Sequence, residues 1–301
     1  MQNSTKKDLR FYFSEFMKDN YLKNLSPDTI DNYDYYCTRF LDFLDTKNII
    51  FYNQITNEVI SEYVYKIRKT TNPISTNTAL KSVRRLCNFI AESRNFRKIK
   101  ITLLKEPEIV KKTFSKYEVA KIFHYTNPCL PMSIAAVFML GTGVRSRTMR
   151  GVQIYDLDFG NKLVTCRQTK NGKILILPLT DFLVETLQKY IDYNNLELDN
   201  YLIFNKFRSP YTRTGFYCMM GKYLKQIGIN KTGIHIFRHT FAKNMILNHS
   251  DAFTLQRWLG HSKLDETKKY VALFSEDLMR NIDEYNPASK KNIDKSPYKS
   301  S

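Results

Sequence analysis

The chain has 301 residues, 43% of them hydrophobic, and its 47 Lys and Arg against 29 Asp and Glu give a formal net charge of +18. This apolar content suffices for a packed core and excludes disorder, collagen and a coiled coil as the main state. No apolar run approaches the roughly 18 residues that span a bilayer. Five scattered Cys without CxxC spacing argue against a disulfide scaffold or a zinc cluster. The positive excess points to a polyanion, with nucleic acid ahead of an anionic membrane surface.

The charge is unevenly distributed along the chain. Residues 1–65 hold 7 basic and 10 acidic residues, whereas residues 66–105 hold 11 basic residues and a single acid, Glu92. Any one charged run is most often a solvated helix face. A block of one sign over this length instead favours a surface that docks on DNA.

The first hundred residues have the apolar spacing of helices. Ser26-Pro27 predicts the start of a helix that continues to Leu44, and Thr56 predicts the start of a second. Ser75 predicts the start of a third, with apolar residues through Ile90. The opposite face of this third helix carries the residues that we expect to contact DNA, namely Lys81, Arg84, Arg85 and Asn88.

The next segments predict a linker and a second domain. Residues 94–114 are basic, contain Pro107 and lack an amphipathic repeat, which is typical of a linker. Ser115 and Glu118 fit a capping box that begins a helix. Residues 131–140 predict a buried helix, and the β-rich runs 162–168 and 173–179 flank Asn171-Gly172, which predicts a hairpin.

Three segments carry residues suited to chemistry. The first runs from Gly141 to Arg150 and places Arg145 directly after a turn; it lacks the GxxxxGK[ST] pattern of a nucleotide-binding loop, and a packed turn with a surface Arg is its plain alternative. The second is His235-Ile-Phe-Arg-His239, where the Ile after His235 replaces the Glu of a zinc protease, so we expect no metal. Two histidines satisfied within a helix are the structural alternative. The third is Leu-Gly-His261 followed by Tyr270, one of twenty tyrosines.

Taken together, these segments resemble the tyrosine recombinase (phage integrase) family. Its pattern is an Arg after a Gly-containing turn, a hairpin Lys, H-x-x-R, then L-G-H and a Tyr nine residues beyond that His. The motifs cover about 115–275, and residues 26–44 are similar to the helical core-binding domain of the family. The matching residues, in the family's order, are Arg145, Lys170, His235, Arg238, His261 and Tyr270.

Two positions depart from the pattern or leave a choice. Family members commonly have Glu or Asp three residues after the first Arg, where this chain has Thr148, which leaves open how Arg145 is oriented. The catalytic Lys could be Lys170 or Lys173, and we favour Lys170 because it lies in the turn.

The resemblance implies phosphoryl transfer from DNA to Tyr270. Arg145 and Arg238 would bind the non-bridging phosphate oxygens, because guanidinium groups stay charged and offer paired donors. His261 would add a donor, and His235 would either donate or assist proton removal from the nucleophile. Tyr270 would attack to form a 3′-phosphotyrosyl bond, and Lys170 would supply the proton that the leaving 5′-oxygen needs. No cofactor, metal or ATP is expected.

The resemblance also implies an architecture and partners. The expected fold is mainly α with a small β-hairpin: an all-helical core-binding domain (1–105), a linker (106–114), a catalytic domain (115–285) and a polar tail (286–301), closing as a C-shaped clamp on DNA. The expected partners are double-stranded core sites with inverted repeats, a homotetramer that exchanges strands through a Holliday junction, and accessory proteins. The segment after Tyr270 could pack on its own domain or on a neighbour. We expect a cytoplasmic, nucleoid-associated protein that does not bind membranes.

Alternatives stay open at this point. A type IB topoisomerase uses a similar Arg, Lys, His and Tyr set, and a catalytically inert DNA-binding regulator could share the fold. Within the recombinases, a core-binding domain that begins near residue 1 favours a simple enzyme without an arm-binding domain. The change at Thr148 favours the integrase or resolvase of a mobile element over a Xer-type resolvase of chromosome dimers.

Overall fold

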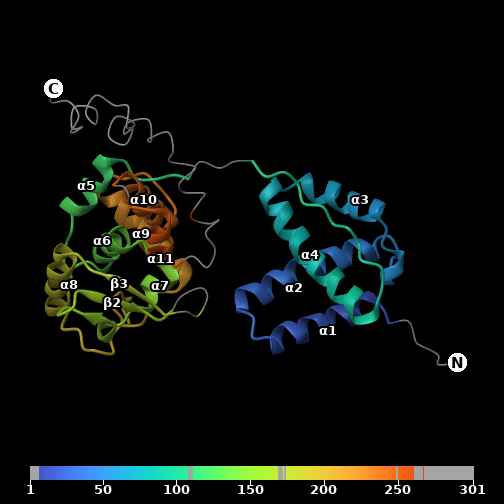
Figure 1. The fold of residues 1–301 in the computed structure, drawn as a ribbon, viewed down its shortest axis with the longest axis horizontal. Helices are drawn as coiled ribbons and strands as arrows, with labels where there is room; N and C mark the ends of the chain where they lie inside the picture. Colours follow the sequence, from blue (N-terminus) through green and yellow to red (C-terminus); the bar gives the residue numbers. More distant parts are fainter. Residues whose placement is uncertain are drawn as a thin grey trace, which may run out of the picture. The chain divides into compact units, whose positions relative to one another are not determined.

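The computed structural model describes residues 7–107, 111–168, 172, 174–248, 250–260 and 267, and Figure 1 traces its fold. The chain divides into two compact units, Met1–Ile109 and Val110–Ser301. The described part of the first unit is built from helices, and the second adds a small antiparallel sheet. The predicted mainly helical fold with one hairpin is therefore confirmed, whereas the domain boundaries at 105, 115 and 285 stay predictions.

The first unit packs three helices around a fourth, α4. Its core consists of aromatic and aliphatic side chains such as Phe16, Phe40, Leu44 and Leu80, each at most 1% exposed. Thr56 caps its helix as predicted, by accepting a hydrogen bond from the Val59 backbone. The elements are α1 (Leu9–Leu22), α2 (Pro27–Asp45), the 3-10 turn η1 (Tyr52–Gln54), α3 (Asn57–Arg68) and α4 (Pro73–Arg94).

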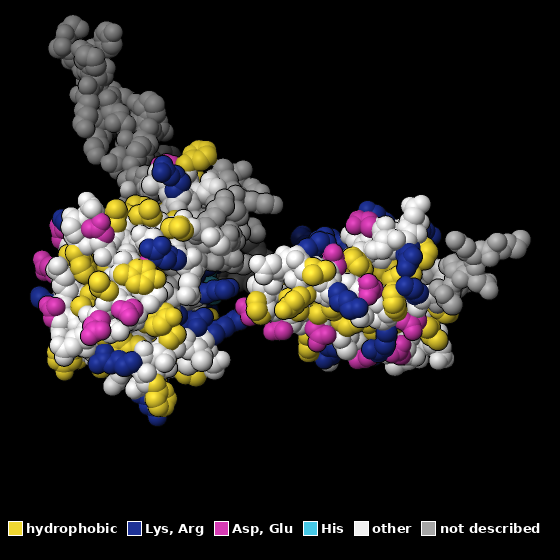
Figure 2. Space-filling model, turned by 90° about the horizontal axis from the view of Figure 1, so that it is seen from below, with side chains coloured by type: hydrophobic (Ala, Val, Ile, Leu, Met, Phe, Trp, Pro, Cys, Tyr) yellow, Lys and Arg dark blue, Asp and Glu magenta, His cyan; other side chains and the backbone are white. Residues whose placement is uncertain are grey.

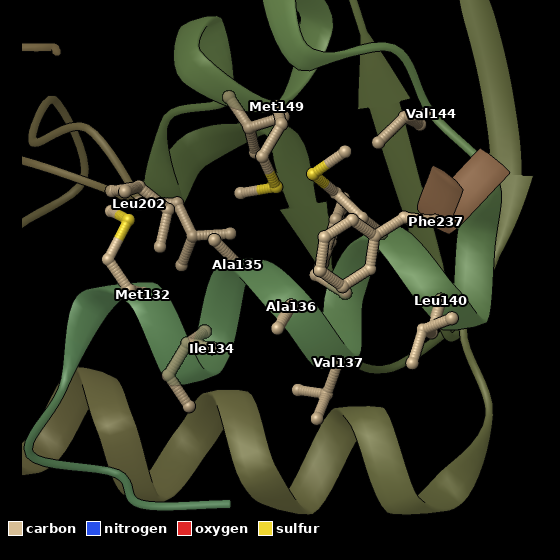
Figure 3. Close-up of a cluster of buried hydrophobic side chains, with 14 of the residues drawn as sticks. Met132, Ile134, Ala135, Ala136, Val137, Leu140, Val144, Met149, Leu202 and Phe237 are labelled. Atoms are coloured by element: carbon tan, nitrogen blue, oxygen red, sulfur yellow. The ribbon is translucent and has the colours of Figure 1, made fainter. Parts of the chain in front are cut away.

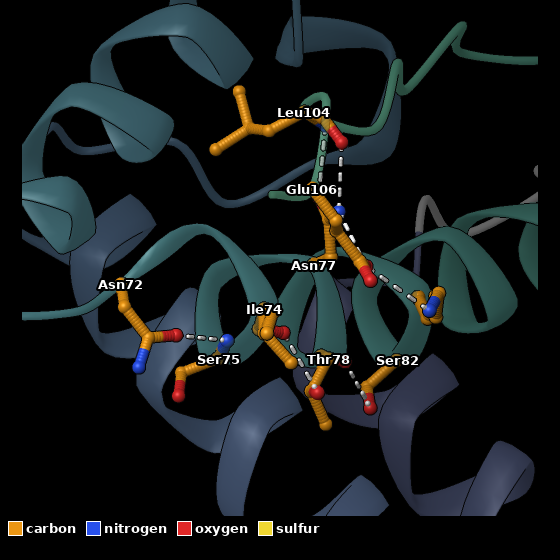
Figure 4. A network of polar contacts seen from close by, with 9 residues as sticks. Asn72, Ile74, Ser75, Asn77, Thr78, Ser82, Leu104 and Glu106 are labelled. Carbon is orange, nitrogen blue, oxygen red and sulfur yellow. Dashed lines mark hydrogen bonds and ion pairs between the residues drawn. The ribbon is translucent and has the colours of Figure 1, made fainter. Parts of the chain in front are cut away.

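The start of α4 corrects one prediction. The helix is capped by Asn72, whose side chain accepts a hydrogen bond from the Ser75 backbone at 2.9 Å, and not by Ser75 itself. Asn72-Pro73 supplies both a strong N-cap residue and a proline at the first helical position, and this pair outweighs the serine three residues later. Figure 4 shows this cap at one end of a row of polar contacts along α4.

Part of the stretch that we predicted as linker belongs to the first unit. After α4 the chain runs back along it, and Ile99 and Ile101 enter the core. Asn77, 1% exposed, donates to the Leu104 carbonyl (2.9 Å) and the Glu106 carboxylate (2.8 Å), and accepts from the Leu104 backbone (2.8 Å). Figure 4 shows these contacts joining α4 to the returning chain. The absence of an amphipathic repeat in this stretch hid its apolar anchors.

The second unit is organised around α6 (Pro131–Thr142), which carries no charged residue. An all-apolar helix is stable only when it is covered on every side, and residues 132–140 are each at most 7% exposed. Figure 3 shows Ile134 and Val137 leaving α6 on one side, while Met149 and Phe237 pack on the other. The predicted buried helix is therefore confirmed. So is the capping box of α5 (Lys116–His124), in which the Ser115 and Glu118 side chains accept each other's backbone N–H.

The remaining elements surround this core. The predicted hairpin is confirmed, with Val164 opposite Leu177 and Cys166 opposite Leu175. The sheet order is β1-β2-β3, and β1 was not predicted from the sequence. The elements are α7 (Ser146–Gly151), the 3-10 turn η2 (Ile154–Asp156), β1 (Leu157–Asp158), β2 (Leu163–Cys166), β3 (Leu175–Pro178), α8 (Asp181–Asn194), α9 (Arg213–Gln226), α10 (His235–Leu247) and α11 (Ala252–Leu259).

The chain entering the second unit is anchored on α10. The Phe114 backbone donates to the hydroxyl of Thr240 at 2.8 Å, and the two rings of Phe114 and Phe237 meet edge to face with centroids 4.9 Å apart. The Lys231 ammonium donates to the Thr113 carbonyl at 2.9 Å. The first residues of this unit therefore rest on the helix that carries His235 and Arg238.

Two surface properties bear on function. On the face drawn in Figure 2, basic and acidic side chains are interspersed over both units, so the positive excess does not form a single patch there. Within the described part of the chain, no helix combines the length and the apolar character that crossing a membrane requires.

Candidate active site

Arg145 lies at the sharp turn between α6 and α7. Gly143 ends α6 in the left-handed region, at φ +68°, and its N–H caps the helix by donating to the Met139 carbonyl. A side chain at this position would also be crowded, because a Cβ on Gly143 would lie 2.4 Å from the Phe241 ring. Arg145 follows in extended conformation as the N-cap of α7, half-buried. The glycine pattern thus predicted the turn, and the turn places Arg145 at a helix start.

Arg238 joins the candidate segments. It lies on α10, is 4% exposed, and its two terminal nitrogens donate to the Gly143 carbonyl at 2.9 Å and the Leu259 carbonyl at 2.8 Å. Gly143 is two residues before Arg145, and Leu259 is two residues before His261. The planar guanidinium fork can satisfy two acceptors at once. A single buried side chain therefore holds together the Gly-turn, H-x-x-R and L-G-H segments.

The two histidines of the second segment differ in their surroundings. His235 is the first residue of α10 and is exposed, whereas His239 lies one turn further on and is half-buried, with ring centroids 6.3 Å apart. Burial, together with the nearby positive charges of Lys111, His235 and Arg238, lowers the pKa of His239 from 6.5 to about 4. His239 is therefore neutral at physiological pH, and the exposed His235 is the better placed of the two to exchange protons with a substrate.

Three of the predicted site residues, Lys170, His261 and Tyr270, lie outside the described residues. Their described neighbours are nevertheless informative. Leu259 is held by Arg238, and Gly260 ends α11 at φ +61° directly before His261. Thr267, three residues before Tyr270, is completely buried.

Thr148 has a role that sequence reasoning did not identify. It is 5% exposed on α7, and its hydroxyl donates to the Gln168 carbonyl at 3.0 Å. Gln168 precedes Lys170 by two residues. A second contact supports the same hairpin arm, because the Arg167 guanidinium pairs with the buried carboxylate of Asp156 at 2.7 Å. The acceptor is a backbone carbonyl, which the sequence cannot indicate. The only sequence signal at this position was that Thr148 replaces the acidic residue usual in the family.

The candidate DNA-contacting residues of α4 differ in how far they are engaged within the unit. The Arg84 guanidinium donates to the Ile101 carbonyl, and Lys81 lies 3.8 Å from the Glu106 carboxylate. Both therefore help to fasten the returning chain. Arg85 is exposed and Asn88 is half-buried. The DNA contacts of all four residues stay predictions.

Across the described ranges, no three His, Cys, Asp or Glu side chains lie close enough together to hold a metal ion. The candidate site is instead a set of cationic and hydrogen-bonding side chains brought together by α7, α10 and the end of α11. Such a set suits the binding of a phosphodiester.

Two models of known protein families match this chain. The model of the phage integrase family matches residues 112–277, and that of the phage integrase SAM-like domain matches residues 8–112. The chain belongs to the phage integrase family. The two matches meet near the division between the two structural units, and the resemblance inferred from the six motif residues is confirmed at the level of the family.

Relatives and solved structures of the family span most of this chain. Tyrosine recombinase XerA of Thermococcus onnurineus is 28% identical over 270 residues, which cover 86% of this chain and 89% of the relative. A lambda integrase tetramer bound to a Holliday junction has a TM-score of 0.71 at 16% identity, covering 89% of this chain and 78% of that one. The Tn1549 transposon integrase in complex with transposon right end DNA has a TM-score of 0.69 at 16% identity, covering 92% and 99%. These structural likenesses establish the integrase fold of the chain.

Proposed function

We propose that this phage integrase family member is a site-specific tyrosine recombinase that cleaves and rejoins DNA through a 3′-phosphotyrosyl intermediate and a Holliday junction. Family membership and the XerA relative support this activity. The observation that carries the proposal for the site is the Arg238 bridge, which brings the turn before Arg145 and the residues before His261 to one guanidinium.

The proposed chemistry uses the six motif residues. The Tyr270 oxygen forms a bond to phosphorus, its proton passes to a base that His235 supplies or assists, and the bond from phosphorus to the 5′-oxygen breaks. The leaving oxygen takes a proton from Lys170. Arg145, Arg238 and His261 stabilise the additional negative charge of the five-coordinate transition state. The bond energy is kept in the phosphotyrosyl link, so rejoining by the reverse steps needs no ATP.

DNA is the partner of this activity, and the finer features of the complex are part of the proposal. We expect each core site to carry inverted repeats, each held by both units of one protomer in a clamp, with accessory proteins where the exchange must be directed. The solved lambda integrase relative is a tetramer bound to a Holliday junction, which supports a homotetramer for this chain. A cytoplasmic, nucleoid-associated location follows from this role as a prediction.

The biological task has two candidates within the family. We favour the integrase or resolvase of a mobile element, because Thr148 departs from the acidic residue that is usual in the family. The XerA relative favours the alternative, a Xer-type resolvase of chromosome dimers. Mapping the footprinted site decides between them: a site at the ends of an element supports the first, and a single chromosomal site outside any element supports the second.

The test of the activity is covalent trapping. The core site is located by footprinting the inverted repeats beside the gene, and a nicked oligonucleotide of this site is incubated with protein. The wild type should form a covalent adduct in which the protein is joined to the 3′-phosphate, and Tyr270→Phe should bind the same DNA without forming it. An inert regulator would give no adduct with either protein. A topoisomerase would relax supercoiled plasmid that lacks the site, which this protein should not do.

A further inference from the structure

The hairpin that carries Lys170 is packed into the core along its ladder, where Val164, Cys166 and Leu177 are buried. The last paired residues are Cys166 and Leu175. In the described part of this arm beyond them, the Arg167 guanidinium pairs with Asp156 and lies over the Tyr155 ring, and the Gln168 carbonyl accepts a hydrogen bond from the Thr148 hydroxyl. Among the described residues before Lys170, Gln168 is the last.

A second contact from α7 reaches the same residue. A Cβ on Gly151 would lie 2.4 Å from the side-chain amide carbon and oxygen of Gln168, so the bare glycine allows Gln168 to lie against the end of α7. Thr148 therefore holds Gln168 through its backbone carbonyl, and Gly151 leaves the room that the Gln168 side chain occupies. Both stand on the short helix that Arg145 begins.

The chemistry of the contact explains why the residue is a threonine. The Gln168 carbonyl can only accept a hydrogen bond, and the Thr148 hydroxyl can donate one. An ionised Glu or Asp at position 148 has no proton to donate and would face the carbonyl oxygen with a negative charge at low exposure. The departure from the family's usual acid and the presence of this carbonyl are thus complementary.

We propose that Thr148 is a positioning residue for proton donation: it holds Gln168 against the helix that Arg145 begins, and so fixes the chain two residues before the proton donor Lys170. The inference rests on the proposed function, because it takes Lys170 as the proton donor. It adds a chain-specific residue to the six motif positions. Thr148 acts through Lys170 and does not touch DNA.

The experiment compares two substrates that differ in their need for a proton. In the ordinary substrate the leaving 5′-oxygen must take a proton from Lys170. In the second, sulfur replaces the bridging 5′-oxygen at the cleaved bond. A thiol loses its proton near pH 8.5, far more readily than an alcohol, so the leaving thiolate needs no donor. A defect in proton donation is therefore corrected by sulfur, and a general defect is not.

Thr148→Val keeps the shape of the side chain and removes the donor. We expect it to slow single-turnover cleavage of the ordinary substrate by about 10- to 100-fold, the effect of a small misplacement of a catalytic group, and to cleave the sulfur substrate at the wild-type rate. Thr148→Ser retains the hydroxyl and should restore most of the rate. Thr165→Val on β2 is the matched control and should change neither rate. Misfolded molecules lower the amplitude of single-turnover cleavage and leave its rate constant unchanged, so the rate constants are compared.

A double variant tests whether Thr148 acts through Lys170. If it does, Thr148→Val should have no further effect on the cleavage rate once Lys170→Ala has removed the donor. The inference is overturned if Thr148→Val slows both substrates equally, leaves both unchanged, or slows the Lys170→Ala enzyme further. If the wild type itself forms no adduct, the proposed function fails, and that result is distinct from each of these.

Discussion

At the scale of single residues, Arg238 has a structural role beside the catalytic role that we propose for it. Its guanidinium is buried and donates to the carbonyls of Gly143 and Leu259. Arginine carries five N–H donors in a fixed fork, so one side chain can organise backbone and also bind phosphate. Arg238, which the sequence predicts to bind phosphate, thus also connects the Gly-turn, H-x-x-R and L-G-H segments.

Replacing Arg238 should therefore have two separable effects. Arg238→Ala leaves two buried carbonyls without this donor, and we expect the free energy of unfolding to fall by about 3 kcal/mol. Cleavage should be abolished, while the folded fraction still binds the site, because many other phosphate contacts supply affinity. Urea unfolding and gel shifts measure the two effects. Arg238→Lys is the control that keeps the charge but cannot span both carbonyls, and it should be intermediate in stability. If Arg238→Ala unfolds at the same urea concentration as the wild type, Arg238 has no structural role.

His239 should make the stability depend on pH. Its pKa falls from 6.5 to about 4, chiefly through burial, so the unfolded chain binds a proton that the folded chain refuses. Its contribution is complete above pH 6.5 and is lost progressively as the pH falls from 6.5 towards 4. Urea unfolding at pH 7.5 and pH 5 should show a loss at the lower pH that is smaller in His239→Gln. An equal loss in both proteins would contradict the assignment.

At the scale of elements, the turn between α6 and α7 depends on the backbone of Gly143. Any side chain there meets two costs, the positive φ and the Phe241 ring 2.4 Å from the added Cβ. We expect Gly143→Ala to lower the free energy of unfolding by about 2 kcal/mol or more. Gly221 on α9 is the matched control, since nothing lies within 4 Å of an added Cβ. Gly221→Ala should raise the stability by about 0.5–1 kcal/mol. Equal effects of the two substitutions on the unfolding midpoint would show that the turn tolerates a side chain.

Sequence patterns predicted those elements whose causes are local. The Ser115–Glu118 capping box, the apolar run of α6 and the Asn-Gly hairpin each depend on residues close together in the chain, and each is confirmed. The start of α4 was placed three residues late because a serine was preferred to the Asn72-Pro73 pair. The polar anchors were beyond reach for another reason: Asn77 meets Leu104 across 27 residues, and Arg238 meets Gly143 across 95. Every residue carries a backbone carbonyl, so the sequence cannot show which carbonyls accept these hydrogen bonds.

At the scale of the whole molecule, the net charge of +18 must be divided between structure and DNA binding. Arg84 and Arg85 are neighbours on α4 with different surroundings, since Arg84 donates to the Ile101 carbonyl and Arg85 is exposed. Arg85→Ala should weaken DNA binding, lower the slope of log affinity against log salt by about one, and leave unfolding unchanged. Arg84→Ala should also destabilise the first unit. Binding titrations at several salt concentrations, with urea unfolding of both variants, measure the difference. Equal stability of Arg84→Ala and Arg85→Ala would contradict the structural role of Arg84.

In the proposed clamp, the anchoring of the connecting chain at both ends limits how far apart the two units can bind on DNA. Asn77 holds Glu106 to α4, and Lys231 holds Thr113 on the other side, so the seven steps from 106 to 113 can extend to at most about 24 Å. The chain is a short tether, and its length determines how strongly binding by one unit favours binding by the other. Inserting six Gly and Ser residues between Ile109 and Val110 doubles the six-residue segment 107–112. This should lower site affinity by about threefold while each unit unfolds as before. Unchanged affinity would mean that the units bind DNA independently.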